Sequence, residues 1–181
     1  MPKILKFTAA LSLISAVLAA ALYSIFPLSM FFTLAITFGT ISYHLLMRLI
    51  IGTALGSPAF IRPDYTKGWY KVRPWEHRVY KLLRVKRWKN KMPTYSPENF
   101  SPKLHSWEDI AVNMCCAERV HEVISALSFV PLIAHVWFGA FWVFLVTSLC
   151  GAALDLSFAV IQRYNRMKIA KIAFRRGARP H

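Results

Sequence analysis

Residues 4–55 read ILKFTAALSLISAVLAAALYSIFPLSMFFTLAITFGTISYHLLMRLIIGTAL. Two long apolar runs lie in this stretch, residues 4–26 and residues 28–55, and little more than Pro27 separates them. Each run is about as long as the ~20 residues that cross the core of a bilayer. The sequence therefore predicts two membrane-spanning helices that pair as a hairpin.

A signal peptide would also place basic residues before an apolar run. Residues 22–27 lack a small-x-small cleavage site, however, and a second span follows immediately. We therefore expect residues 4–26 to be an ordinary span or a signal anchor.

A second apolar block follows later in the chain. Residues 111–136 carry charges near their start and then become uncharged, and residues 139–161 carry one charge, at Asp155. A turn within residues 135–139 would make these runs a second hairpin. The sequence predicts an all-α, polytopic membrane protein with about four transmembrane helices in two hairpins, forming a single membrane domain over residues 1–181.

The positive charge is distributed unevenly. The formal net charge is +15, and 56% of the residues are apolar but gathered into runs, which excludes a soluble basic domain. A connector, residues 62–107, has eleven Lys and Arg between residues 62 and 91, a tail, residues 163–181, has seven, and the turns near Pro27 and Gly139 have none. Positive residues in short loops stay in the cytoplasm. We expect a multi-pass protein of the cell membrane, with the connector and both termini cytoplasmic.

The connector interleaves aromatic and basic side chains. Its aromatic residues include Trp69, Tyr70, Trp75, Tyr80 and Trp88. Such a segment suits the headgroup layer, where aromatic rings reside and basic side chains meet anionic lipid. Because membrane spans flank it, we expect membrane lipids and not nucleic acid as its partner.

Three prolines in residues 92–102 predict a loop. We expect a helix to resume at Ser106, because Asp109 follows three residues later in a capping arrangement. The three cysteines, Cys115, Cys116 and Cys150, show no disulfide framework or zinc spacing, and we interpret them as small apolar filler.

Ionisable side chains inside the spans cost about 3 kcal/mol each and call for a partner or a function. His44 and Arg48 are four residues apart on the second span, and Glu118 and His121 are three apart on the third. Each pair therefore shares a helical face.

Asp155 shares a face of the fourth span with Gln162. If the hairpins pack together, all these faces can form one polar pocket open to the cytoplasm, where carboxylate and imidazole can remove a proton from a hydroxyl. Alternatively the groups simply pair, Arg48 with Asp155 or with Glu118. A metal site is the third interpretation, with His44, His121, Glu118 and Asp155 as the ligands. We predict no metal, because the spacing is not His-Glu-x-x-His and the Glu-x-x-His pair occurs once.

The tail begins with residues 162–166, QRYNR. Arg163 and Arg166 can anchor the end of the helix by snorkelling. They can equally form a fork for a phosphate, on an acyl donor or on a lipid headgroup.

Four motifs occur in order along the chain: Trp75-Glu76 with Tyr80, then RWKNKMP at 87–93, AERVH at 117–121 and QRYNR at 162–166. Together they resemble the glycosyl-4,4'-diaponeurosporenoate acyltransferase family, over roughly residues 75–168. The resemblance implies a small integral membrane protein that transfers a fatty acyl group to a sugar hydroxyl of a glycosylated carotenoid during staphyloxanthin-type pigment synthesis. The site residues that it implies are Trp88, Lys89, Pro93, Glu118, His121, Gln162, Arg163, Tyr164, Asn165 and Arg166.

The sequence departs from the family pattern at three positions. The family has an acidic residue where Thr94 stands, and an asparagine and a proline where Asp155 and Ser157 stand. A changed acceptor is compatible with these differences, so another glycolipid or a lipid alcohol is an alternative to the carotenoid.

We predict catalytic roles for His121, Glu118, Asp155, Asn165 and Tyr164. His121, oriented by Glu118, would take the proton of the attacking hydroxyl, and Asn165 or Tyr164 would donate to the oxyanion of the tetrahedral intermediate. No residue stands out as a covalent nucleophile.

We predict substrate-binding roles for His44, Arg48, Trp88, Lys89, Gln162, Arg163 and Arg166. The two arginines, with Lys89, would bind the phosphates of a cytoplasmic acyl-coenzyme A or acyl-carrier thioester, which is a co-substrate and not a permanently bound cofactor. The acceptor would be a lipid-linked sugar. The alternatives are a small membrane transferase or reductase with another cytoplasmic cofactor, and a non-enzymatic four-helix subunit for lipid binding or assembly. The sequence leaves the oligomeric state open.

Overall fold

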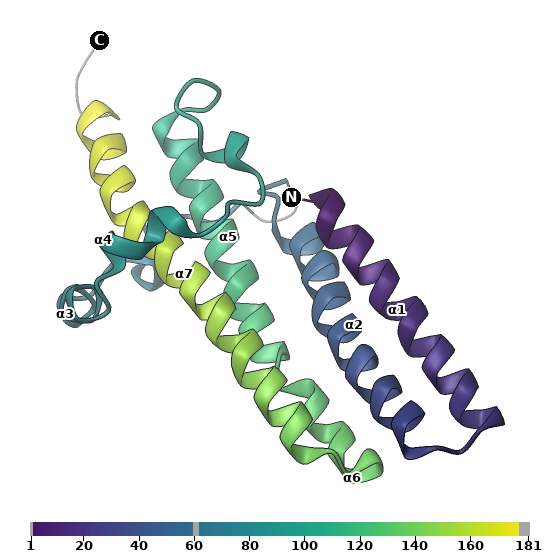
Figure 1. Cartoon of the computed structure of the whole chain (residues 1–181). Coiled ribbons are helices and arrows are strands. Elements are labelled where there is room, and N and C mark those ends of the chain that lie inside the picture. The colour runs from purple at the N-terminus through teal and green to yellow at the C-terminus, as the bar shows by residue number, and fades with distance from the viewer. Residues whose placement is uncertain (1, 60–61, 178–181) are drawn as a thin grey trace. The chain divides into compact units, whose positions relative to one another are not determined.

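The computed structural model describes residues 2–59 and 62–177, and this part of the chain contains helices and no strand. Four helical segments in it are long and apolar enough to cross a membrane: Lys3–Ile25, Ser29–Leu55, Trp107–Phe138 and Phe141–Arg175. The prediction of an all-α polytopic membrane protein is confirmed (Figure 1).

The chain divides into two compact units. Unit 1 consists of Met1–Gly52 and Val123–Asp155, and unit 2 of Thr53–Glu122 and Leu156–His181. Two long helices, α5 (Trp107–Leu127) and α7 (Phe141–Gly177), contribute residues to both units.

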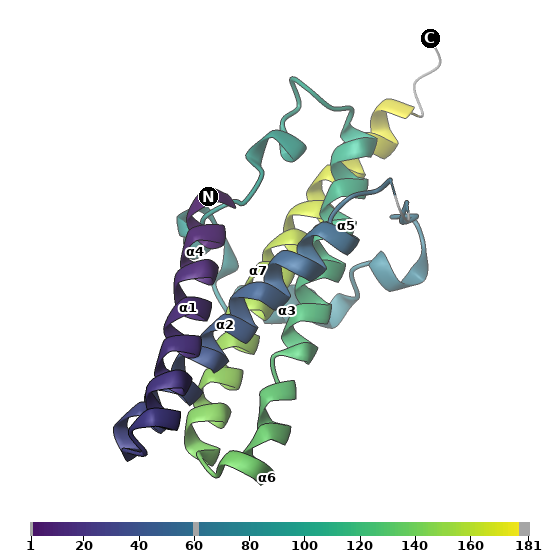
Figure 2. The same ribbon diagram turned by 90° about the vertical axis from the view of Figure 1, so that its right-hand side faces the viewer.

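Unit 1 contains the first hairpin, helices α1 (Pro2–Ile25) and α2 (Ser29–Leu55), which run side by side in both views (Figures 1 and 2). Proline disfavours a helical conformation in the residue before it, and α1 ends just ahead of Pro27. Small residues let the two helices approach closely, since the Ser42 hydroxyl donates a hydrogen bond to Ser12 Oγ at 3.0 Å.

The second hairpin of unit 1 has an interrupted first arm. After α5 ends, a 3₁₀ turn (Val130–Ala134) and the short helix α6 (His135–Phe138) lead into α7. Pro131 lies in the 3₁₀ turn, where its missing N–H cannot continue an α-helix. Gly139 makes the reversal with φ of +74°, a conformation that glycine adopts without steric cost.

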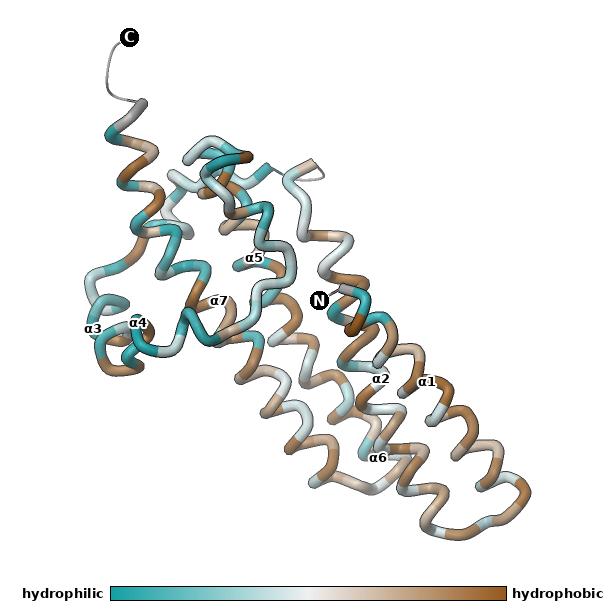
Figure 3. The backbone as a smooth tube through the Cα atoms, turned by 45° about the horizontal axis from the view of Figure 1, so that its top comes forward, coloured by the Kyte–Doolittle hydropathy of each residue, from teal (hydrophilic) through white to brown (hydrophobic). Residues whose placement is uncertain are grey.

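Unit 2 contains the connector. Its helical elements are 3₁₀ turns at Gly68–Tyr70, Lys89–Lys91 and Pro97–Phe100 and the short helices α3 (Pro74–Leu82) and α4 (Val85–Trp88). Hydrophilic residues dominate α3 and α4, in contrast to α1 (Figure 3). Arg84, with φ of 49°, separates α3 from α4, and Trp88 Nε1 donates to the Leu83 carbonyl across this bend at 2.8 Å.

Two local predictions in unit 2 agree with the structure. Residues 92–102 contain one short 3₁₀ turn and no α-helix. The Ser106 hydroxyl accepts a hydrogen bond from the Asp109 backbone N–H at 3.1 Å and donates to the Asp109 carboxylate at 2.7 Å, which caps α5 as predicted.

Helix α7 extends without a break from the fourth span into the basic tail, as far as Gly177. The tail predicted over residues 163–181 is therefore helical up to that residue, and residues 178–181 lie outside the described part of the chain. The QRYNR motif consequently stands on a regular helix.

Cys115 and Cys116 are free and buried, and Cys150 is free and exposed.

Candidate active site

Glu118 of α5 lies at the centre of a buried ion-pair network in unit 2. Its side chain is fully buried, and each carboxylate oxygen accepts a hydrogen bond from a different arginine of α7. Arg163 Nη1 contacts Oε1 at 2.7 Å, and Arg166 Nη1 contacts Oε2. Since Arg163 and Arg166 are three residues apart, both lie on the face of α7 that meets α5.

Arg163 also clamps a second carboxylate, that of Glu76 on α3. Its Nε contacts Glu76 Oε2 at 2.6 Å and its Nη2 contacts Oε1 at 3.0 Å, in the two-pronged geometry that suits a guanidinium. The Tyr80 hydroxyl donates to Glu76 Oε2 at 2.8 Å, and the Arg73 backbone N–H donates to Oε1 at 3.1 Å. The same carboxylate thus caps α3 and holds it to α7.

Electrostatics keep Glu76 ionised. Burial by itself raises the pKa of Glu76, but the hydrogen bonds from Arg163, Arg73 and Tyr80 outweigh it and lower that pKa to about 2. Burial and the hydrogen bond to Glu76 raise the pKa of the Tyr80 hydroxyl. Tyr80 is therefore a neutral donor at physiological pH.

Arg166 is as fully engaged as Arg163. It is 1% exposed, its Nη2 donates to the Tyr70 carbonyl at 2.9 Å, and its guanidinium lies over the Tyr70 ring at 4.8 Å. Two arginines and two glutamates balance one another in this network, as buried charges require. Its contacts join the connector, α5 and α7.

A second polar contact joins the RWKNKMP and QRYNR motifs. Lys89 Nζ donates to Asn165 Oδ1 at 2.8 Å. An ammonium group can only donate, so it fixes the amide orientation: the oxygen of Asn165 faces Lys89, and the amide hydrogens of Nδ2 remain available to donate elsewhere.

The Tyr164 ring gathers two cations beside this contact. Lys89 Nζ lies 5.6 Å and Lys168 Nζ 4.7 Å from the ring centroid. Tyr80 packs edge-on against the same ring at 5.4 Å. In the part of the chain that the structure describes, neither lysine forms an ion pair with a carboxylate.

His121 lies one turn along α5 from Glu118. Its ring stacks on Phe158 of α7, with centroids 4.9 Å apart and planes at 21°. Phe158, Gln162 and Asn165 follow the i, i+4, i+7 pattern, so they share one face of α7. Gln162 is half-buried on that face, between the positions of the other two.

Unit 2 thus contains ten of the predicted site residues: Trp88, Lys89, Pro93, Glu118, His121, Gln162, Arg163, Tyr164, Asn165 and Arg166. Unit 1 contains the other three, His44, Arg48 and Asp155. A single pocket formed by both sets stays a prediction. In unit 1, Arg48 Nη2 pairs with Asp155 Oδ2 at 2.5 Å, which is one of the two pairings considered from the sequence.

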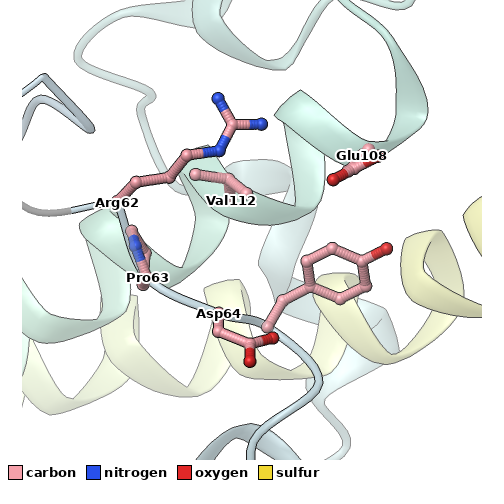
Figure 4. A pocket seen from close by; sticks show the side chains of 6 residues that line it. Arg62, Pro63, Asp64, Glu108 and Val112 are labelled. Carbon is pink, nitrogen blue, oxygen red and sulfur yellow. The ribbon is translucent and has the colours of Figure 1, made fainter.

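Unit 2 also contains a cavity of about 250 Å³, lined by Arg62, Pro63, Asp64, Tyr65, Glu108 and Val112 (Figure 4). None of these lining residues belongs to the four motifs.

Among the described residues, no group of three or more His, Cys, Asp or Glu side chains is placed to hold a metal ion.

Sequence reasoning did not include Glu76, Tyr80 and Tyr70 among the site residues. Tyr70 contributes through its carbonyl and its ring face, which leave no pattern in a sequence. Glu76 did leave one, because it is the single acidic residue among residues 65–97 of a strongly basic connector.

Four membrane-spanning helices and a buried glutamate–arginine network define a polytopic α-helical membrane protein with a polar site in unit 2. Residues 66–175, more than half of the chain, match the family model of glycosyl-4,4'-diaponeurosporenoate acyltransferase. The chain belongs to this family and is an acyltransferase, which confirms the resemblance found in the motifs. Neither a search of curated proteins nor a search of solved structures finds a match.

Proposed function

We propose that the protein transfers a fatty acyl group from a cytoplasmic thioester, acyl-coenzyme A or an acyl-carrier protein, to a hydroxyl of a glycosylated lipid such as a carotenoid glycoside. It works in the cell membrane, with both termini and the connector in the cytoplasm. The observation that carries the proposal is the Lys89–Asn165 hydrogen bond, because it leaves an oriented amide donor on a helix that the family motifs define.

The reaction face is the side of α7 formed by Phe158, Gln162 and Asn165. His121, stacked on Phe158, takes the proton of the lipid hydroxyl as its oxygen attacks the thioester carbonyl. The tetrahedral intermediate then collapses and expels the thiolate, to which His121 returns the proton. No covalent acyl-enzyme is needed, since the hydroxyl oxygen forms the new ester bond directly.

Asn165 stabilises the charge that develops on the carbonyl oxygen. Its Nδ2 hydrogens are free to donate because Lys89 holds Oδ1. Donors that are oriented before the reaction stabilise an oxyanion without reorganisation during it. Lys89 is thus a positioning residue for Asn165.

The arginines have a structural role in this scheme. Arg163 and Arg166 are paired with Glu76 and Glu118, so they hold α3 and α5 against α7. The phosphates of the donor instead bind Lys89 and Lys168, which lie beside Tyr164. The ammonium groups of these two lysines have no carboxylate partner among the described residues.

The test is lipid mass spectrometry of cells that produce the acceptor glycolipid and express wild type, Asn165→Asp or His121→Gln at matched protein levels. Asn165→Asp keeps an oxygen for Lys89 and loses the amide donors. We expect a glycolipid with one added fatty-acyl mass in the wild type, and about 10²–10³-fold less of it with Asn165→Asp. Asn90→Asp, at an exposed position, is the matched control and should retain activity.

Two results would overturn the proposal. One is a lipid profile that is the same with and without the wild-type protein. The other is full activity of both Asn165→Asp and His121→Gln, because the reaction face would then take no part in acyl transfer.

A further inference from the structure

Unit 1 contains a large apolar cavity of about 780 Å³. It is lined by α1, α2, the segment around the 3₁₀ turn and α6, and the start of α7, with six aromatic side chains: Tyr23, Phe32, Tyr43, Trp137, Phe138 and Phe144. Its volume lies within the range of about 300–1,000 Å³ typical of small-molecule sites. The lining suits an apolar chain.

One turn beyond the cavity, two buried polar side chains lack partners. Thr40 and Phe144 line the cavity, and His44 and Ser148 follow each of them by four residues on α2 and α7. His44 is 8% exposed and Ser148 is 0% exposed. The two ring nitrogens of His44 have no hydrogen-bond partner among the described residues, and the Oγ atom of Ser148 has none either.

The two side chains belong to one meeting surface of α2 and α7. A Cβ atom at Gly151 would lie 3.3 Å from Cε1 and Nδ1 of His44, so the imidazole packs directly on the α7 backbone there. Ser148 precedes Gly151 by three residues and therefore lies on the same face of α7. Glycine favours this close approach, because a Cβ atom at position 151 would force the ring to shift by a few tenths of an ångström.

The neighbouring polar groups are already occupied. Arg48 donates to Asp155 Oδ2 at 2.5 Å and to the His44 carbonyl at 2.7 Å, and the Ser128 hydroxyl donates to the Ile124 carbonyl at 2.9 Å. An unmade hydrogen bond at a buried polar group is destabilising, because the group has lost its bonds to water without replacing them. The free capacity at His44 and Ser148 therefore indicates a ligand.

The chemistry of the pair specifies a neutral hydroxyl group. A neutral imidazole offers one donor and one acceptor, and a serine hydroxyl offers both, so a hydroxyl group complements them. A charged headgroup does not, because Arg48 and Asp155 already neutralise each other and an added buried charge would be unpaired.

We propose that unit 1 binds a lipid alcohol, with its apolar chain in the 780 Å³ cavity and its hydroxyl on His44 and Ser148. The site involves residues of unit 1 alone, and it does not depend on the acyl-transfer mechanism proposed for unit 2. A water molecule offers the same hydrogen bonds, and the experiment separates these two sources of a hydroxyl.

The experiment uses the full chain in phosphatidylcholine nanodiscs. The probe is hexadecanol with a photoreactive diazirine and an alkyne tag on its chain, and the control probe is its methyl ether, which cannot donate a hydrogen bond. Labelled residues are mapped by mass spectrometry, and untagged hexadecanol is the competitor. We expect the alcohol to label residues that line the unit 1 cavity at least about tenfold more than the ether.

Three variants sharpen the test. Ser148→Ala removes an unpaired hydroxyl and should leave the fold intact while lowering alcohol labelling about tenfold. Thr147→Ala is the matched control, since the Thr147 hydroxyl is bound to the Val143 carbonyl of its own helix at 2.7 Å. Gly39→Leu should fill the cavity and abolish labelling, because a Cβ atom there meets nothing within 4 Å.

Equal labelling by alcohol and ether would overturn the proposal and assign water to the polar pair. Labelling unchanged by Ser148→Ala, or spread over unit 1 without concentration at the cavity, would also overturn it.

Discussion

Replacing Glu118 with glutamine removes the carboxylate that Arg163 and Arg166 share. Arg163 keeps Glu76, but Arg166 loses its carboxylate partner in a position where it is 1% exposed. Removing one partner of a buried ion pair costs about 3–5 kcal/mol, because the other charge stays buried and uncompensated. For a chain of this size that corresponds to a fall in melting temperature of about 6–20 °C.

The measurement is thermal unfolding of the purified protein in detergent micelles, followed by intrinsic fluorescence. Glu108→Gln, at an exposed position on the same helix, is the control and should melt like the wild type. Adding Arg166→Met to Glu118→Gln removes the stranded charge and should recover part of the loss. The reasoning is refuted if Glu118→Gln and Glu108→Gln melt at the same temperature.

Three further outcomes are expected. The pKa of Glu76 falls from its usual 4.5 to about 2 in the fold, so the ionised carboxylate stabilises the protein by about 3 kcal/mol above pH 4.5. This stabilisation is lost as the pH falls towards 2. Urea unfolding measured across this pH range checks the loss, and Glu76→Gln should flatten the dependence of stability on pH. Gly139→Ala should lower the free energy of unfolding by about 1–3 kcal/mol because position 139 has a φ of +74°, whereas Gly52→Ala within α2 should be neutral or stabilising. Gly139→Ala should therefore have the lower melting temperature of the two, and the reverse order would contradict this expectation. Lys89→Met frees the amide of Asn165 to rotate, and kcat should fall about tenfold or more at saturating donor, in assays of the purified enzyme; a change in KM alone would argue against the positioning role.

Several features of the fold could be predicted from local sequence. Hydropathy over about 20 residues identifies a span without reference to any other part of the chain. The turn at Gly139 and the Ser106 cap depend on residues that are close in sequence, and both agree with the structure. The family motifs are likewise read in order along the chain.

The partners of the charged side chains could not be predicted in this way. The spacing of Glu118 and His121 predicted a shared helical face, but it did not identify the partners of the Glu118 carboxylate. Those partners are Arg163 and Arg166, more than forty residues further along the chain. Glu76 joins the same network from the connector. Several arginines and lysines were equally plausible partners on charge alone.

The sequence by itself therefore determined the membrane class, the four apolar spans, the turns within each hairpin and the motifs, because hydrophobicity, turn chemistry and motif order are local properties. Only the tertiary structure decided that Arg163 clamps both Glu76 and Glu118 and that Lys89 orients Asn165. It also decided that the ring nitrogens of His44 are buried without a hydrogen-bond partner among the described residues. These contacts depend on which helical faces meet. The faces that meet are those that leave the least unpaired buried charge and the least empty space between side chains in each unit. This depends on the whole unit, so no local stretch of sequence encodes the pairing of helical faces.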